Sequence, residues 1–145
     1  MKTNINREPF MTGIKLIDEQ HNAYLDLVED ILKLCLSPGI TLGDIHDEME
    51  HIIKYAQEHF EEEERIMQSL SYPFYEEHFA KHNLFRQQLD TMLKELEVSQ
   101  TTELFDYTAF QMRLGKWLVQ WFGDQVRNDD MKMVCFIKEH SSDNL

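Results

Sequence analysis

Residues 59–82 read HFEEEERIMQSLSYPFYEEHFAKH and contain two pairs of potential metal ligands, His59 with Glu63 and His78 with His82. The members of each pair are four residues apart, so on a helix both side chains project from one face. The Ser-Tyr-Pro sequence between the pairs predicts a turn that separates two helices. We therefore expect two adjacent helices, each of which presents a rigid pair of ligands.

The hydrophobic pattern on both sides of this stretch predicts an all-α protein. Only three prolines and five glycines occur in the 145 residues, and they fall mostly between long segments with helical periodicity. Four helices with short connections are expected to pack as an up-down-up-down four-helix bundle that follows an N-terminal arm.

The expected helix boundaries come from capping residues and turns. Asp18 is a good N-cap for a first helix that ends near Leu36. The second helix begins at 41 or 42 and ends near 70, and the third begins near Pro73. A polar break at 99–102 precedes the fourth helix, which starts near 107 and either ends before the segment 131–138 or includes it.

These boundaries place the candidate ligands at one end of the bundle. His21 lies near the start of the first helix, the His59/Glu63 pair in the last third of the second, and the His78/His82 pair near the start of the third. At about 1.5 Å per residue, their levels agree to within about two turns. A buried group of imidazoles with a carboxylate is costly unless it binds something. We therefore predict a metal site.

The ligand types narrow the choice of metal. Imidazole and carboxylate suit iron, manganese or zinc better than calcium or copper(I), and the number of ligands suggests a binuclear site. In the acidic run 61–64 only Glu63 lies on the core stripe, so Glu61, Glu62 and Glu64 are expected on a solvated face. The remaining histidines are assigned no metal role: His46, His51 and His140.

The composition argues against several classes of partner. The net charge of −13 disfavours nucleic acid, whose binding depends on Lys and Arg neutralising phosphates, and also anionic membrane surfaces. No apolar run approaches the roughly 20 residues of a membrane span, and no signal peptide is evident, so a cytoplasmic location is expected. The sequence identifies no protein partner. Cys35 and Cys135 lie in apolar stretches, which predicts two buried thiols, and a disulfide between them stays open.

The residues that carry these predictions resemble the hemerythrin family, particularly its bacterial single-domain members. The resemblance runs from Gly13 to about Lys132 and rests on four motifs: GIKLIDEQH at 13–21, HFEEEE at 59–64, YP at 72–73 and HFAKH at 78–82. It implies one hemerythrin-like domain over 1–145, with an N-terminal arm at 1–16, a bundle at 17–138 and a tail at 139–145.

The resemblance also implies two non-heme iron ions joined by an oxo or hydroxo bridge, with dioxygen as the ligand of one iron. On this basis His21 and His59 would hold the oxygen-binding iron. His78 and His82 would hold the second iron, and Glu63 would bridge the two. The implied function is binding of dioxygen or a related diatomic such as nitric oxide, in sensing, storage or delivery, rather than catalysis.

The fourth helix departs from the family pattern, in which Trp-Leu-x-x-His-Ile is followed by an aspartate five residues after the histidine. An alignment from Trp117 places Trp121 and Val126 at the two ligand positions and removes both ligands. An alignment from Trp121 places Gln125 at the histidine and Asp130 at the aspartate. We prefer the second alignment because it keeps the bridging carboxylate and its apolar neighbours.

The glutamine leaves the state of the second iron open. A neutral amide oxygen is a weaker iron ligand than imidazole, so Gln125 either coordinates weakly, holds a metal-bound water or leaves an open position. A simpler interpretation is that Gln125 only packs and hydrogen-bonds in a site that lacks one metal. Asp129 is the fallback for the bridging aspartate, and Trp121, one turn before Gln125, is expected to line the metal pocket.

Two other functions follow from these alternatives. An open position on the second iron would favour a diiron redox enzyme, an oxidase, peroxidase or ferroxidase, at the expense of reversible oxygen binding. The other is a redox-sensing interaction module whose bundle changes shape with the state of the metal.

Overall fold

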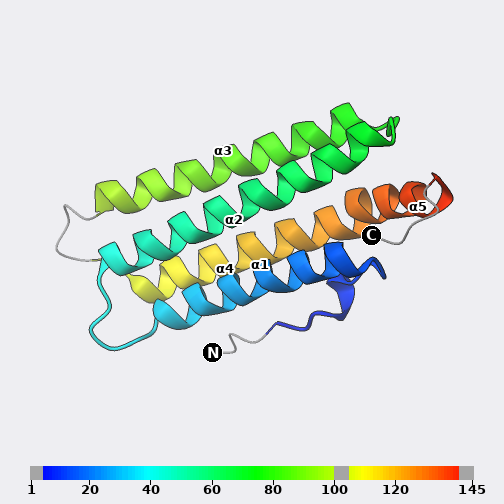
Figure 1. Cartoon of the computed structure of the whole chain (residues 1–145). Helices are drawn as coiled ribbons and strands as arrows, with labels where there is room; N and C mark the ends of the chain where they lie inside the picture. Colours follow the sequence, from blue (N-terminus) through cyan, green and yellow to red (C-terminus); the bar gives the residue numbers. More distant parts are fainter. Residues whose placement is uncertain (1–4, 100–104, 141–145) are drawn as a thin grey trace.

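The computed structural model describes residues 5–99 and 105–140, and four long helices dominate this part of the chain (Figure 1). They are α1 (Lys15–Leu34), α2 (Leu42–Ser69), α3 (Tyr75–Ser99) and α4 (Tyr107–Gln125). A 3₁₀ turn, η1 (Glu8–Phe10), precedes α1, and a π-helical segment, η2 (Val126–Asp130), joins α4 to a last helix, α5 (Met131–His140). Successive long helices run in opposite directions, which confirms the predicted all-α, up-down-up-down bundle.

Parts of the predicted organisation lie outside the described residues: positions 1–4 of the arm, 100–102 of the polar break and 141–145 of the tail. Within the described part, α1 ends at Leu34, two residues before the predicted end. The segment 131–138, whose helical state was left open, belongs to α5 and continues the direction of α4 (Figure 1).

Asp18 determines where α1 begins, but it does so from inside the helix rather than as its N-cap. Its Oδ1 accepts hydrogen bonds from the Thr12 backbone N–H and hydroxyl at 2.6 and 2.7 Å, and its Oδ2 accepts one from the Gly13 N–H at 3.0 Å. Gly13 has a φ of 87°, which favours glycine. The helix therefore starts at Lys15, three residues before the predicted start, and the preceding segment folds back over it.

A capping box begins α2 at the predicted place. The Thr41 hydroxyl accepts from the Asp44 N–H at 3.2 Å, and the Asp44 carboxylate accepts from the Thr41 N–H at 3.1 Å. At the other end Ser71 takes a φ of 53°, and the Tyr72 N–H donates to the Met67 carbonyl at 2.8 Å. This turn reverses the chain, so the His59 and His78 ends of α2 and α3 lie side by side.

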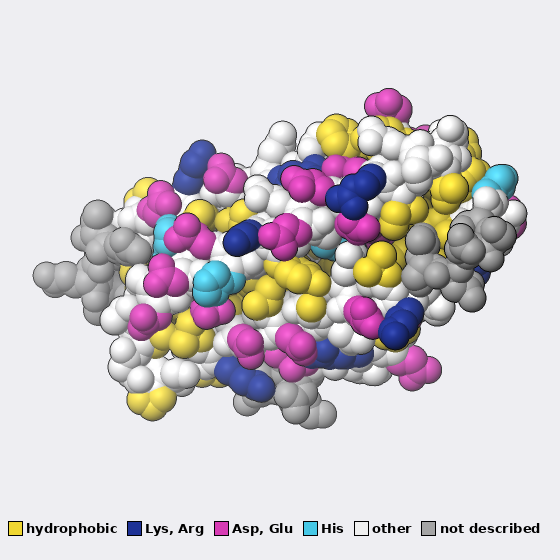
Figure 2. Space-filling view, in the orientation of Figure 1, with side chains coloured by type: hydrophobic (Ala, Val, Ile, Leu, Met, Phe, Trp, Pro, Cys, Tyr) yellow, Lys and Arg dark blue, Asp and Glu magenta, His cyan; other side chains and the backbone are white. Residues whose placement is uncertain are grey.

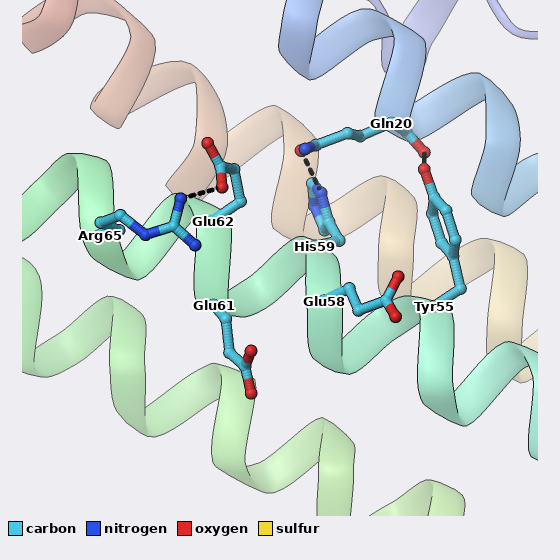
Figure 3. Close-up of a pocket in the computed structure, with 7 residues that line it drawn as sticks. All are labelled: Gln20, Tyr55, Glu58, His59, Glu61, Glu62 and Arg65. Atoms are coloured by element: carbon cyan, nitrogen blue, oxygen red, sulfur yellow. Dashed lines mark hydrogen bonds and ion pairs between the residues drawn. The ribbon is translucent and has the colours of Figure 1, made fainter.

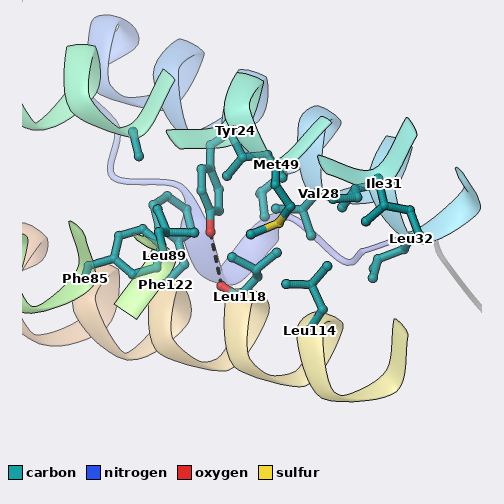
Figure 4. Packing of buried hydrophobic residues seen from close by; sticks show 14 of the residues in the cluster. Tyr24, Val28, Ile31, Leu32, Met49, Phe85, Leu89, Leu114, Leu118 and Phe122 are labelled. Atoms are coloured by element: carbon teal, nitrogen blue, oxygen red, sulfur yellow. Dashed lines mark hydrogen bonds between the residues drawn. The ribbon is translucent and has the colours of Figure 1, made fainter. Parts of the chain in front are cut away.

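Aromatic rings stack within the apolar core of the bundle, where Figure 4 labels Tyr24, Phe85 and Phe122 among aliphatic neighbours. Tyr24 of α1 stacks on Phe122 of α4 with ring centroids 4.3 Å apart, and Phe85 of α3 stacks on Trp121 at 3.8 Å. Phe60 of α2 meets Phe85 edge to face at 5.6 Å. Such pairs contribute about 0.5–1.5 kcal/mol each beyond the area that they bury. This aromatic layer joins all four long helices and supports the polar residues beside it.

A second apolar cluster closes the bundle where α5 lies. Its buried members come from the start of α1 and the residue before it, the end of α2, the turn that follows α2, and α5: Ile14, Ile17, Met67, Tyr72, Met133, Val134 and Ile137. On α1 His21 lies between Ile17 of this cluster and Tyr24 of the aromatic layer, and on α2 Glu63 lies between Met67 and Phe60. The candidate ligands therefore lie where the two sets meet.

The surface matches the acidic composition. Figure 2 shows Asp and Glu side chains spread over the visible face with Lys and Arg among them. No helix in the described ranges is long and apolar enough to cross a membrane. Cys35 is buried, but Cys135 is exposed, and neither forms a disulfide. The prediction of two buried thiols is therefore wrong for Cys135, which lies on the outer face of α5.

Replacement of Asp18 by alanine should destabilise the protein by about 2 kcal/mol, because three hydrogen bonds to a carboxylate are lost. The free energy of unfolding in urea measures the effect. The matched control is Glu19→Ala at the next position, which removes only an exposed pair with Lys15 at 3.9 Å. Equal stability of the two variants would contradict the role given to Asp18.

Candidate metal centre

Four histidines from three helices meet at the α5 end of the bundle. His21 comes from α1, His59 from α2, and His78 and His82 from α3, and none is more than 4% exposed. Two carboxylates lie among them, each fully buried: Glu63 of α2 and Asp130 at the end of η2. The structure thus brings together every residue that the sequence predicted as a firm ligand, and Asp130 with them.

Glu63 lies between histidines of two helices. Its Oε1 is 3.2 Å from Nε2 of His59 and 3.3 Å from Nε2 of His82. The first of these histidines belongs to the pair expected at one metal, and the second belongs to the pair expected at the other. The carboxylate is therefore placed to be shared.

Asp130 makes the same kind of connection with the other two histidines. Its Oδ2 is 3.1 Å from Nε2 of His21, and its Oδ1 is 3.1 Å from Nε2 of His78. Each buried carboxylate thus contacts one histidine of each expected pair. Asp129, the fallback, points elsewhere, because both of its oxygens accept from Lys81 at 2.8 Å.

The π-helical segment explains how Asp130 reaches this position. Five residues separate Gln125 from Asp130, and on a regular α-helix they would project about 140° apart. The segment Val126–Asp130 forms a π turn, whose hydrogen bonds run from residue i to i+5. Both side chains consequently face the histidines, and both are buried.

Hydrogen bonds that Nδ1 donates orient three of the four imidazoles. Nδ1 of His21 donates to the Phe10 carbonyl at 2.8 Å, and Nδ1 of His59 donates to Gln20 Oε1 at 2.8 Å. Nδ1 of His82 donates to Glu64 Oε2 at 2.7 Å. A neutral imidazole that donates from Nδ1 presents the lone pair of Nε2. In all three rings Nε2 faces the carboxylates, which is the tautomer that a metal ligand requires.

The electrostatics of the centre favour positive charge. Burial alone would lower the pKa of His21 and His82, but the carboxylates around them outweigh burial, so both pKa values are raised. Burial alone would raise the pKa of Glu63, but His59 and His82 outweigh it and hold that pKa well below its usual range. Two buried carboxylates thus demand a nearby cation.

Several buried polar atoms at the centre have no hydrogen-bond partner within the described residues. On the candidate ligands they are Nε2 of His59 and of His82, Nδ1 of His78, both carboxylate oxygens of Glu63, and Oδ1 of Asp130. Such atoms are costly to bury. The six candidate ligands form two groups, and within each group the possible ligand atoms lie within 4.8 Å of one another. One group is His21, His59, Glu63 and Asp130, and the other is Glu63, His78 and His82. The donor set therefore fits two metal ions with shared carboxylates.

Gln125 stands beside the second group. It is 4% exposed, its Nε2 is 3.5 Å from Nε2 of His78, and its Oε1 has no partner in the described part of the chain. This placement supports the alignment that starts from Trp121. Trp121 itself is half-buried and lies with Gln125 in the wall of a pocket between α3 and α4.

Glu64 departs from its expected place on a solvated face. It is 9% exposed, accepts from His82 Nδ1, and pairs with Arg86 at 3.1 Å. The sequence does contain a pattern that predicts burial of Glu64. Phe60 lies four residues before it and Met67 three residues after it, so the three side chains share a second buried face of α2. Glu61 is exposed and Glu62 is partly exposed, as predicted.

Gln20 is a second residue that the sequence reasoning did not find. It holds His59 through its side chain, and its backbone carbonyl accepts from the Tyr55 hydroxyl at 3.2 Å (Figure 3). These residues line a cavity of about 300 Å³, whose wall also carries Glu58 and Glu61. His59 is thus the candidate ligand that lines this cavity.

The other histidines lie apart from this centre. His46 contacts Glu50 at 3.0 Å and Glu97 at 3.1 Å at the far end of α2, His51 is exposed, and His140 donates to the Phe136 carbonyl at 2.9 Å. His46, Asp47 and Glu50 could together hold a cation, but Asp47 and Glu50 are exposed.

Comparisons with known proteins agree with this geometry. Residues 12–137 match the family described as the hemerythrin HHE cation binding domain. Among similar proteins, the bacteriohemerythrin of Stenotrophomonas maltophilia is 24% identical over 88% of this chain and 77% of its own length. The bacteriohemerythrin of Pseudomonas aeruginosa is 24% identical over 91% of this chain and 80% of its own. A crystal structure of wild-type hemerythrin superposes with a TM-score of 0.76 at 18% identity, and the match covers 92% of this chain and 96% of that chain.

Replacement of Glu64 by glutamine should weaken metal binding by about 10- to 100-fold, because His82 loses the charged acceptor that orients it and raises its basicity. Competition with a chelator measures the affinity. The control is Glu62→Gln, which alters only a surface pair with Arg65 on the same helix. Unchanged affinity in the Glu64 variant would contradict the contribution of this carboxylate.

Proposed function

Because the chain belongs to the hemerythrin family, we propose that it is a non-heme diiron protein that binds dioxygen or a related diatomic such as nitric oxide, for sensing, storage or delivery. The observation that carries the proposal is the pair of buried carboxylates, Glu63 and Asp130. Each lies within 3.3 Å of one histidine from each expected pair. A cytoplasmic location remains part of the proposal.

The proposed roles follow from the contacts. His21 and His59 would hold one iron, His78 and His82 the other, and Glu63 and Asp130 would bridge them. Iron would supply a redox-active centre at which a diatomic ligand coordinates. The protein keeps three of the four imidazoles, those of His21, His59 and His82, in the tautomer that presents Nε2, through acceptors at Nδ1.

Aromatic side chains exclude water from the proposed irons. Phe60 stacks on His82 with ring centroids 4.0 Å apart, and Phe122 meets His21 edge to face at 5.0 Å. An apolar surround lowers the local dielectric and limits proton access, which favours reversible binding over loss of reduced oxygen species. The cavity of about 300 Å³ beside His59 lies next to the proposed iron of His21 and His59.

Iron-loaded protein should contain about two iron ions per chain, as the two ligand groups require. After anaerobic reduction, admission of dioxygen should produce a visible charge-transfer band that disappears when dioxygen is removed. His59→Ala should abolish the band, whereas His46→Ala, at the far end of α2, should leave it intact. Two bound irons without any such band would refute reversible dioxygen binding.

A second candidate function is a diiron redox enzyme, an oxidase, peroxidase or ferroxidase. The observation that favours it is Gln125, whose neutral amide takes the place next to His78 where an imidazole would complete the ligand set. An incomplete set leaves room for a substrate at the second iron.

Gln125→His separates the two functions, because it would supply the missing imidazole. If the protein is an enzyme, peroxide turnover with a reductant should fall at least roughly tenfold, as expected when an open metal position is filled, and the oxygenated form should last longer. Turnover in the parent protein is the reference, and an unchanged rate in the variant would count against catalysis at this position.

A further inference from the structure

The chain before α1 runs back along that helix in the direction opposite to it (Figure 1). The contacts between the two follow the same order. The Ile5 backbone N–H donates to Glu29 at 3.1 Å, and nearer the start of α1 His21 donates to the Phe10 carbonyl at 2.8 Å. We call residues 5–14 the N-terminal strap. The strap therefore connects the surface of α1 to a candidate metal ligand on the same helix.

Arg7 fastens the strap to the surface of α1. Its Nη1 donates to the Asn22 backbone carbonyl at 3.0 Å, and its Nη2 donates to Asp26 at 2.6 Å and to Glu29 at 3.0 Å. These three partners are spaced by four and three residues, so they lie along one side of the helix. A guanidinium reaches all of them at once because its donors form a rigid planar fork. Arg7 therefore fixes the level of the strap on α1.

The backbone of the strap connects this anchor to the metal ligand. The Arg7 carbonyl accepts from the Phe10 N–H at 2.9 Å and closes the turn η1. The Phe10 carbonyl in turn accepts from Nδ1 of His21, whose Nε2 faces Asp130 at 3.1 Å. Consecutive hydrogen bonds thus run from acidic side chains on the surface of α1, through Arg7 and Phe10, to the ring of His21.

Phe10 also covers this side of the candidate metal centre. It is 4% exposed and stacks on Phe122 with ring centroids 5.6 Å apart, and Phe122 meets His21 edge to face at 5.0 Å. If the strap lifts from α1, His21 loses both its acceptor and part of this aromatic cover. A neutral imidazole without an acceptor at Nδ1 is free to carry its proton on Nε2, where it cannot bind a metal.

We propose that Arg7 is a positioning residue for His21, and that the N-terminal strap controls the exchange of the metal ion held by His21 and His59. The closed strap retains this ion, and release of Arg7 from α1 lets it leave. The other metal ion is independent of the strap, because its ligand His82 has an acceptor on α2, Glu64. The proposal rests on the diiron function proposed above.

The first test loads the protein with cobalt(II) and follows its visible absorption while an excess of EDTA removes the metal. Two ions should leave in two phases. Arg7→Gln should accelerate one phase roughly 3- to 10-fold, and Glu64→Gln should accelerate the other. Arg7→Lys keeps the charge but lacks the fork, so it should restore part of the wild-type rate. The control is Lys15→Gln, which removes the same charge from an exposed pair with Glu19.

Ionic strength gives a further readout, because Arg7 and its partners are partly exposed. Added salt should accelerate the strap-dependent phase more in the wild-type protein than in Arg7→Gln, which has no charged anchor left to screen. Equal acceleration of both phases in Arg7→Gln would indicate general loosening of the bundle and would overturn the proposal. Wild-type release rates in this variant would also overturn it.

The second test needs no metal, so it separates failure of this proposal from failure of the diiron function. Hydrogen exchange of the Phe10 backbone N–H in the metal-free chain reports opening of the strap, because this group donates to the Arg7 carbonyl. Arg7→Gln should accelerate exchange there roughly 3- to 10-fold and leave the N–H of Ile52, in the middle of α2, unchanged.

The outcomes of the exchange measurement decide between the two proposals. Unchanged exchange at Phe10 in the variant, or an equal change at Ile52, would overturn the role of Arg7 even if two metals bind. Faster exchange at Phe10 alone, in a chain that binds no metal, would support the anchoring of the strap by Arg7 and refute the diiron function.

Discussion

The burial of two carboxylates among four histidines is the constraint on which the rest of the structure depends. Glu63 and Asp130 are both fully buried, where an uncompensated negative charge would be prohibitively costly. The raised pKa values of His21 and His82 and the lowered pKa of Glu63 all express the same requirement for positive charge. The bundle can therefore keep this centre only by supplying that charge, through protons or through metal ions.

The acceptors around the histidines are not equivalent, and this makes the two halves of the centre different. His21 and His59 donate to neutral oxygens, those of Phe10 and Gln20, whereas His82 donates to the carboxylate of Glu64. A charged acceptor makes an imidazole a stronger donor to a metal. Among the three histidines with an acceptor at Nδ1, the one with a charged acceptor, His82, lies in the group that Gln125 adjoins.

Much of the fold and of the ligand set could be predicted from the sequence, because both depend on regular spacing. Residues four apart share a helix face, and short turns put the paired ends of α2 and α3 at one level, which brought His59, Glu63, His78 and His82 together in the prediction. The start of α1 could not be found in this way, because Asp18 acts on residues that precede the helix. Glu64 was predicted on a solvated face because only one buried face of α2 was considered, whereas α2 buries two rows of side chains.

Asp130 required the family resemblance, since a helical period of 3.6 residues does not place it with Gln125. The π turn between them changes the direction in which later side chains project from one nearly continuous helix, which comprises α4, η2 and α5. Before the π turn, α4 turns its apolar side toward the aromatic layer, and after it, α5 turns its apolar side toward the cluster that closes the bundle. The π turn therefore has two effects. It turns the Asp130 carboxylate toward the histidines. It also turns the apolar side of α5 toward the cluster that closes the bundle beside the candidate metal centre.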